Sequence, residues 1–237
     1  MLPATLPALL QRIRRNGLPL LCRGCLRPLD RGAEAGLCGL CWEGLAPLPE
    51  PRCPCCALPH APGPCPDPVA WTCGDALWDY RGGRPPMGAL LVPGIKAGEH
   101  GWKQALLARS LLRPLPAFAT GTDVVTAVPA ALQRRWSRGF DLAEDAAGLV
   151  AERSGLPFVR ALRRSWSLRR QAGHTESERR RLPRKAVLLR SDAGIRNRIV
   201  LLVDDVWTTG TTLLRCAQAL QAGGAREVRV LTLFRAT

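Results

Sequence analysis

The chain has 237 residues, of which 46% are hydrophobic, enough for one large domain or a medium domain with a small appendage. No run approaches roughly 18 consecutive apolar residues, which excludes an obvious membrane-spanning helix. The formal net charge is +15, and residues 130–198 hold 17 Arg and Lys against 7 Asp and Glu, a local net charge of +10. Such a field attracts polyphosphates, nucleotides or nucleic acid, although any single arginine is equally well explained as solvated surface.

The first residues, MLPATLPALLQRIRRNG, place prolines in the apolar part and arginines after it. This order is the reverse of a secretory signal, so we expect the chain to be cytoplasmic. A cytoplasmic location argues against disulfide bonds as the role of the ten cysteines, because that compartment keeps thiols reduced.

Four cysteines at the front of the chain have the spacing of a metal site. They fall as two pairs, Cys22-x-x-Cys25 and Cys38-x-x-Cys41, which is typical of a tetrahedral four-cysteine zinc site. The residues between them show neither helical nor strand periodicity, so a metal would have to supply most of the folding energy. We expect this module to have a hydrophobic core of its own.

A second cysteine series is less complete. Cys53-x-x-Cys56 is followed by Cys65, but Pro68 stands where a fourth cysteine would close the set. A structural zinc site needs four ligands, and the fourth could be His60, Cys55 or Cys73, or the series could be a remnant that binds nothing. Cys73 is better explained as a strand residue, and Cys216 as a small buried hydrophobic residue.

The middle of the chain alternates strand and helix patterns after a proline-rich stretch at 47–68. Residues 71–80 predict a strand and the start of a hairpin. Residues 87–115 predict two helical pieces around Pro93 and Gly94, with Lys96 between them. Lys96 is a candidate ligand residue, although a surface lysine with an apolar stem is the competing interpretation.

A further strand at 123–129 runs into the basic loop ALQRRWSRGF. Arg138 and Gly139 follow the carboxyl end of this strand, where open α/β sheets bind ligands. An amphipathic helix is expected at 142–153. Residues 163–181 have no apolar stripe, and their charge density suggests a mobile surface segment.

The most informative stretch is IVLLVDDVWTTGTTL, residues 199–213. Its apolar start predicts a strand buried on both faces, which we expect to end at Asp204 and Asp205. A hydroxyl-rich turn, Thr208, Thr209, Gly210, Thr211 and Thr212, then leads into a helix that stops near Gly223. Backbone N–H groups at such a turn bind phosphate, whereas the carboxylates suit ribose hydroxyls and Mg²⁺. The alternative is a buried strand with an acidic turn and a threonine cap.

This stretch resembles the 5-phosphoribosyl-1-diphosphate (PRPP) motif of type I phosphoribosyltransferases. The order of cysteine pairs, GIKAG, VP with RRWSRGF, Gln171 with Glu178-Arg179, and VDDVWTTGTT resembles ComF-type competence proteins over about residues 22–235. The resemblance implies an α/β chain with the type I phosphoribosyltransferase fold, a mostly parallel sheet flanked by helices, and a small N-terminal zinc-binding module. It divides the chain into an N-terminal segment at 1–19, a double zinc-ribbon-like module at 20–70 and a phosphoribosyltransferase-like domain at 71–237.

The resemblance also implies roles for individual residues. Asp204 and Asp205 take the ribose and magnesium role, residues 208–212 bind the 5′-phosphate, and Lys96, Arg138 and Gly139 lie on the diphosphate side. The chain departs from the family at Asp141 and Leu142, where Asn-Gln is usual, and at Trp207, which replaces a small residue. An indole at that position would either pack beneath the loop or crowd the ligand.

Two classes of function follow. The first is a PRPP-binding protein of DNA uptake and natural transformation that transfers phosphoribose to an acceptor the sequence does not identify; no residue stands out as its general base. The second is a non-catalytic PRPP or nucleotide sensor whose basic segment holds single-stranded DNA, with Trp136 and Trp166 offered for stacking. Zn²⁺ and Mg²⁺ are the expected metals, and other DNA-uptake proteins the expected partners.

Overall fold

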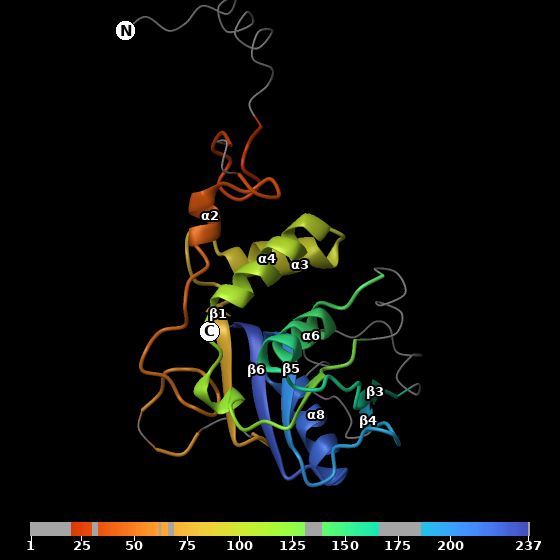
Figure 1. Ribbon diagram of the computed structural model, residues 1–237. Helices are drawn as coiled ribbons and strands as arrows, with labels where there is room; N and C mark the ends of the chain where they lie inside the picture. The colour runs from red at the N-terminus through yellow and green to blue at the C-terminus, as the bar shows by residue number, and fades with distance from the viewer. Residues whose placement is uncertain are drawn as a thin grey trace, which may run out of the picture.

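A parallel sheet organises the computed structural model, which describes residues 20–29, 33–61, 63–65, 69–130, 139–165 and 186–236. Its four strands, in the order β1-β6-β5-β2, are β1 (Cys73–Asp79), β6 (Glu227–Arg235), β5 (Ile199–Trp207) and β2 (Val124–Ala127). A separate antiparallel pair joins β3 (Leu162–Arg164) to β4 (Val187–Leu189). Because the four strands run in one direction, their carboxyl ends share one edge of the sheet (Figure 1).

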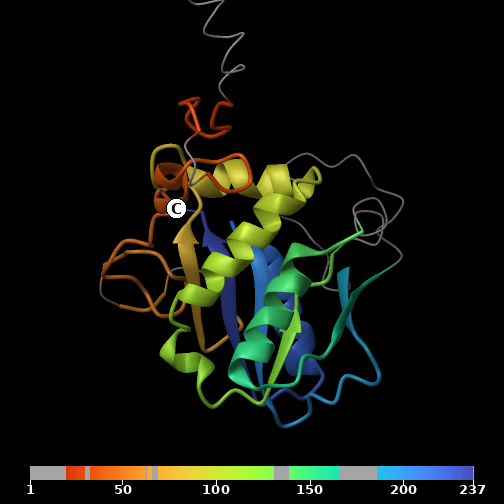
Figure 2. The ribbon, with the colours of Figure 1, turned by 45° about the horizontal axis from the view of Figure 1, so that its top comes forward.

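Helices cover both faces of this sheet (Figure 2). Helix α4 (His100–Leu112) and helix α6 (Leu142–Ser154) cross one face, with α3 (Met87–Lys96) packed against α4. Helix α8 (Thr211–Ala222) covers the other face. Two short pieces, α2 (Gly39–Glu43) and the 3₁₀ turn η1 (Ala117–Ala119), complete the described helices. This arrangement confirms the predicted α/β class with a parallel sheet between helices.

The apolar run of β5 forms the centre of the core. Leu201 and Val203 face the side of α4 and α6, whereas Val200 and Leu202 face the side of α8. All four are no more than 1% exposed, which is why the strand reads as a continuous apolar run. No described helix is both long and apolar enough to cross a membrane.

Three boundaries differ from the sequence prediction. The hairpin expected after residues 71–80 is wrong, because β1 pairs in parallel with β6. Helix α3 runs through Pro93 and Gly94 to Lys96, so the break falls later, at residues 97–99. Gly94 is required at that point because a Cβ there would lie 2.3 Å from the Trp102 ring. Strand β5 continues through both acids to Trp207.

The basic segment is described only in part. Arg163 and Arg164 belong to β3 rather than to an irregular segment, since β3 pairs with β4. The other predictions for this region fall on Arg138, Trp136, Trp166, Gln171 and Arg179, which lie outside the described residues.

The cysteine module does not have the separate core that its sequence predicts. Cys22, Leu37 and Trp42 belong to the same buried cluster as residues of α3, α4 and the sheet. Contacts across this junction are reciprocal. Arg109 of α4 stacks over Trp42 at 4.1 Å, and Arg23 of the module stacks over Trp102 of α4 at 4.6 Å. Both indole N–H groups donate to one loop of the module, at Glu34 O (3.1 Å) and Ala35 O (2.8 Å). The module is therefore packed onto α4.

Candidate functional site

The turn between β5 and α8 presents backbone donors to solvent. Thr208 and Thr209 are exposed, and Thr209 Oγ1 lies 3.0 Å from Thr211 Oγ1. In the described part of the chain, no hydrogen bond is donated by the backbone N–H groups of residues 208–212. These groups lie at the N-terminus of α8, where the helix dipole favours an anion. We call residues 208–210 the phosphate loop.

Gly210 is the N-cap of α8 and has φ +71°. A Cβ at this position would lie 2.9 Å from Trp207 Nε1. Both the left-handed backbone and the close ring therefore require glycine.

A lysine from a distant helix meets the acids at the end of β5. Lys96, the last residue of α3, places its Nζ 2.5 Å from Asp205 Oδ2. The Lys96 side chain is 33% exposed and that of Asp205 15%, so the pair sits at the rim of the site. The structure thus brings together Lys96 and the acids, which the sequence placed in one site without showing how they meet.

A negative charge on Asp204 is unfavourable in the ligand-free protein. Burial and the neighbouring charge of Asp205 raise the pKa of Asp204 well above its usual value, while the Asp205 N–H and the Lys96 ammonium act in the opposite direction. The Asp205 N–H donates to Asp204 Oδ1 at 2.8 Å. A cation with oxygen preference would relieve this crowding of negative charge, so the donor set fits Mg²⁺.

Asp141 explains one departure from the family pattern. It caps α6 by accepting from the Ala143 N–H through Oδ1 (3.2 Å), and its Oδ2 accepts from the Ala130 N–H (3.3 Å). An asparagine has one acceptor oxygen and would lose one of these bonds. Burial raises the pKa of Asp141, and the charge of Asp205 adds to this shift. Leu142 is 3% exposed and packs in the core.

Trp207 packs beneath the phosphate loop. It is 2% exposed and meets Trp71 edge-to-face, with ring centroids 5.3 Å apart and planes at 82°. The guanidinium of Arg235 stacks over the Trp207 ring at 4.6 Å. The indole therefore supports the loop from the protein side and leaves the outer side of the loop to a ligand.

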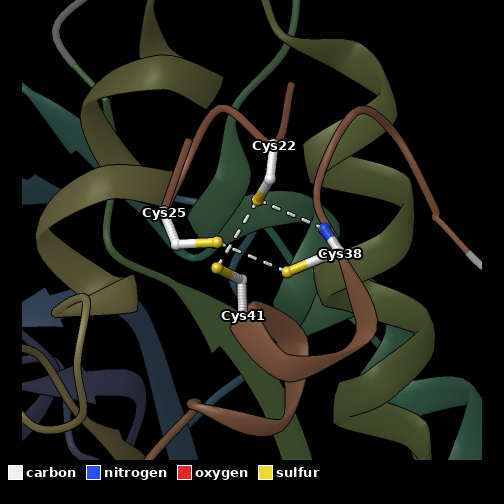
Figure 3. Close-up of side chains that lie close together, drawn as sticks. All are labelled: Cys22, Cys25, Cys38 and Cys41. Carbon is white, nitrogen blue, oxygen red and sulfur yellow. Dashed lines mark hydrogen bonds between the residues drawn. The ribbon is translucent and has the colours of Figure 1, made fainter. Parts of the chain in front are cut away.

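The four front cysteines converge on one point, as Figure 3 shows. We call Cys22, Cys25, Cys38 and Cys41 the front cluster. Cys22 Sγ lies 3.5 Å from Cys41 Sγ, and Cys25 Sγ lies 3.6 Å from Cys38 Sγ. These separations are too long for a disulfide of about 2 Å, and they match the roughly 3.8 Å edges of a tetrahedron with Zn–S bonds of about 2.3 Å.

Backbone donors prepare one thiolate of this cluster. Burial raises the pKa of Cys22, but backbone N–H groups that include those of Cys38 and Gly24 outweigh burial and lower it to about 6. Their distances to Cys22 Sγ are 3.3 and 3.4 Å. The arrangement could hold a zinc ion, which binds the thiolate form.

A second set of ligands gathers nearby in the sequence. Cys53, Cys56, His60 and Cys65, the second cluster, place their ligand atoms within 4.8 Å of one another. Of the three candidates for a fourth ligand, His60 is the one that the structure brings to the three cysteines. Its Nδ1 lies 2.8 Å from Ala61 O, so Nε2 is the nitrogen left for a metal, as in many histidine sites.

The two clusters share one backbone pattern. Residue i+2 donates to the first sulfur, as Gly24 does to Cys22 and Cys55 to Cys53, both at 3.4 Å. Residue i+4 donates to the first carbonyl and has positive φ, as at Leu26 (61°) and Ala57 (57°). Cys55 therefore occupies the position of Gly24, a donor position rather than a ligand position. In the sequence, aligning Cys22-x-x-Cys25 with Cys53-x-x-Cys56 already places Cys55 opposite Gly24.

Two site predictions on the diphosphate side stay predictions. Gly139 is described, with φ +73° and open space within 4 Å of where a Cβ would stand. Arg138 falls outside the described residues. Conversely, sequence reasoning missed Arg235, a buried arginine at the end of β6 that bonds to the phosphate loop.

Sequence comparisons relate the chain to known proteins. The family of phosphoribosyl transferase domains matches residues 137–237. The DNA utilization protein YhgH of Escherichia coli O157:H7 is 30% identical over 236 residues, covering 92% of this chain and 98% of the relative. The protein of the same name from Salmonella typhi is 30% identical over 230 residues, with the same coverage of both chains.

Solved structures are more distant. The glutamine PRPP amidotransferase of B. subtilis complexed with ADP and GMP is 24% identical over 55% of this chain, with a TM-score of 0.39, and the match spans 26% of that longer chain. The adenine phosphoribosyltransferase of Leishmania tarentolae is 20% identical over 56% of this chain and 70% of its own, with a TM-score of 0.35. On the full-length similarity to the DNA utilization proteins and on the domain match, the chain belongs to the ComF family and contains a phosphoribosyltransferase domain.

Proposed function

We propose that this protein binds PRPP with Mg²⁺ at the carboxyl edge of its sheet and uses this binding in DNA uptake. The observation that carries the proposal is the combination of unbonded N–H groups at the phosphate loop with a carboxylate pair beside them. The N–H groups suit the 5′-phosphate, and the acids suit ribose hydroxyls and Mg²⁺. Lys96, which lies beside Asp205, would contact the diphosphate.

The chemistry that such a complex supports is transfer of phosphoribose. The bond from C1 of the sugar to the diphosphate breaks with its electron pair, the acceptor forms a bond to C1, and the acceptor loses a proton. The protein's task is to hold the partners and to stabilise the charge of the leaving diphosphate. A sensor needs the binding without the transfer, so release of diphosphate separates these two functions.

The test is to replace both acids. The Asp204→Asn/Asp205→Asn protein should remain folded, because asparagine keeps the shape of each side chain while removing the mutual repulsion of the two carboxylates. It should lose magnesium-dependent PRPP binding. Titration calorimetry measures the binding, and an assay for diphosphate across nucleobases measures transfer. Unchanged PRPP affinity in the double variant would refute the role assigned to these acids.

We also propose that both clusters hold structural zinc. The proposal is supported by the sulfur–sulfur distances in the front cluster, which fit a tetrahedral site, and by the same backbone pattern in the second cluster. Elemental analysis of reduced, folded protein should find two zinc ions per chain. The division into a zinc module at 20–70 and a phosphoribosyltransferase domain at 71–237 remains part of this proposal, with the two parts sharing a core as described.

A second function is supported by the described arginines of the basic segment. Arg163, Arg190 and Arg196 line a hollow of about 750 Å³, and Arg160 and Arg164 line a neighbouring one of about 210 Å³. Such a surface would bind the backbone of single-stranded DNA in a salt-dependent way.

Fluorescence anisotropy with labelled oligonucleotides at several salt concentrations tests this binding. Replacing Arg163 and Arg190 by Gln should lower the salt slope by roughly one per lost phosphate contact, whereas Arg27→Gln on the zinc module should not change it. If PRPP displaces the oligonucleotide and the two changes weaken PRPP more than DNA, the arginines serve PRPP instead.

A further inference from the structure

We call residues 53–56 of the second cluster the knuckle. Three successive backbone carbonyls of the knuckle accept hydrogen bonds from the phosphoribosyltransferase domain. Pro54 O accepts from the Gly74 N–H (2.8 Å), Cys55 O from Trp71 Nε1 (2.7 Å) and Cys56 O from Arg235 Nε (2.9 Å). All three donors belong to residues that contact Trp207 or would contact it through an added Cβ. The knuckle is therefore hydrogen-bonded to the residues that surround Trp207.

Arg235 extends these bonds to the phosphate loop. Its Nη1 donates to Trp207 O (3.0 Å) and Thr208 O (2.6 Å), and the residue is 3% exposed. A trans peptide directs its C=O and its N–H to opposite sides. Arg235 holds Thr208 O inward, and Trp207 O is held both by Arg235 and by the Ala236 N–H (2.9 Å). The N–H groups of Thr208 and Thr209 therefore point outward, to the side where a phosphate would bind.

The ring contacts leave little freedom between these parts. A Cβ on Gly74 would lie 2.9 Å from the Trp207 ring and 3.0 Å from Cys55 O. A Cβ on Gly210 would lie 2.9 Å from Trp207 Nε1. The knuckle, the indole and the phosphate loop are thus in consecutive close contact.

A metal would add to the constraints on the knuckle. The described residues between 45 and 72 contain neither helix nor strand, so the knuckle is held by its three bonds to the domain, by the burial of Cys56 and Ala57, and by the ligands that would converge on an ion. Arg235 cannot keep its bonds to Cys56 O and Thr208 O if those two groups move apart.

We propose that Arg235 is a positioning residue that transmits the state of the second cluster to the phosphate loop, so that the metal at Cys53, Cys56, His60 and Cys65 sets the affinity for a sugar phosphate. The inference rests on the proposed function, because the loop must bind a phosphate. It assigns to this metal a control of ligand binding in addition to its structural role.

Ribose 5-phosphate is the probe, because it engages the phosphate loop without the diphosphate side at Lys96. Cys65→Ser should lower the zinc content from two ions to one and weaken ribose 5-phosphate by at least tenfold. Arg235→Lys keeps the charge but not the fork that spans Cys56 O and Thr208 O, and it should weaken the probe similarly while retaining both ions. Magnesium affinity at Asp204 and Asp205 should stay within twofold in both.

A control and a double variant complete the test. Arg229→Lys changes an arginine on the same strand, far from the loop, and should leave the affinity within twofold. If Arg235 carries the coupling, the protein with both Cys65→Ser and Arg235→Lys should bind no more weakly than the weaker single variant. Multiplying effects, or an unchanged affinity in Cys65→Ser, would overturn the proposal.

Amide hydrogen exchange of residues 208–212 gives a readout that needs no ligand. Exchange should speed up in Cys65→Ser and in Arg235→Lys, and not in Arg229→Lys. If the parent protein binds neither ribose 5-phosphate nor PRPP while exchange changes in this way, the coupling stands and the proposed function fails. If Cys65→Ser does not fold, Arg235→Lys decides: unchanged exchange and affinity there refute the coupling.

Discussion

Replacing Lys96 by Met should change the affinities for Mg²⁺ and for PRPP in opposite directions. Without PRPP, the ammonium of Lys96 sits 2.5 Å from Asp205 Oδ2, where it neutralises a carboxylate that Mg²⁺ would use. Its removal frees this carboxylate, so Mg²⁺ alone should bind more tightly. With PRPP, the same lysine is expected to contact the diphosphate, so its removal should weaken PRPP even at saturating Mg²⁺.

The magnitude follows from the geometry of the pair. At 2.5 Å and an effective dielectric constant of about 20, the Coulomb attraction is about 7 kcal/mol. Desolvation cancels most of this, and hydrogen bonds to charged groups contribute a net 1.5–3 kcal/mol or so. We therefore expect a change of roughly 10- to 100-fold in each affinity, because about 1.4 kcal/mol corresponds to a factor of ten.

Isothermal titration at one fixed pH measures both affinities in the parent and in the variant. Lys103→Met is the matched control: Lys103 Nζ pairs with Asp145 Oδ2 at 2.7 Å on α4 and α6, and its loss should leave both affinities unchanged. A folded Lys96→Met protein that binds Mg²⁺ no more tightly than the parent would refute the competition between lysine and metal. An unchanged PRPP affinity would refute the diphosphate contact.

Three further outcomes are expected. Asp204→Asn should raise the free energy of unfolding at neutral pH without ligand. The raised pKa of Asp204 means that the folded state binds more protons than the unfolded state, so the stability of the parent falls as pH rises above the ordinary pKa of 3.8. Urea unfolding should show that the gain shrinks towards about pH 4, and an equal gain at pH 4 and at neutral pH would contradict this cause. Gly94→Ala should lower the free energy of unfolding by about 1–3 kcal/mol, because the added Cβ would clash with Trp102. The control Gly148→Ala, at a helix position where an added Cβ meets no atom within 4 Å, should raise the free energy of unfolding by about 0.5–1 kcal/mol. An unchanged stability of Gly94→Ala would show that the Trp102 ring moves freely. Cys22→Ser should speed amide hydrogen exchange in α3 and α4 as well as in residues 20–45, because the cysteine module and these helices share a core. Faster exchange confined to residues 20–45 would instead support a separate core for the module.

Local signals are sufficient for the part of the site that is contiguous in sequence. Strand β5, the phosphate loop and α8 follow one another in the chain. The apolar run predicts the strand, the composition of the turn predicts the loop, and the spacing of apolar residues predicts the helix. The predicted strand end falls too early because Asp204 and Asp205 are polar, whereas strand pairing with β6 continues past them to Trp207. Side-chain polarity marks neither the end of backbone pairing nor the end of burial, since Trp207, beyond the two acids, is 2% exposed.

Contacts between distant segments cannot be predicted in this way. Arg235 has no local signal, since it acts only because β6 lies beside β5 in a register that pairs it with Trp207. Whether Trp207 packs beneath the loop or crowds the ligand is likewise decided by distant residues. Trp71, just before β1, and Gly74, on β1, lie against its ring on the protein side. Strand order and register determine these contacts, and neither is encoded in a short stretch of sequence.

The pairing of β1 with β6 also sets the order of events during synthesis. Cys73 and Arg229 are partners in this ladder, yet the ribosome makes them 156 residues apart, which takes on the order of ten seconds at about 5–20 residues per second. Both cysteine clusters are complete by Cys65. Their thiols therefore emerge well before the sheet can close and before Arg235 exists to bond Cys56 O. If the clusters bind zinc as proposed, the metal can load before the ligand site is complete, and a chain that lacks it completes β6 without an ordered partner for the Arg235 guanidinium.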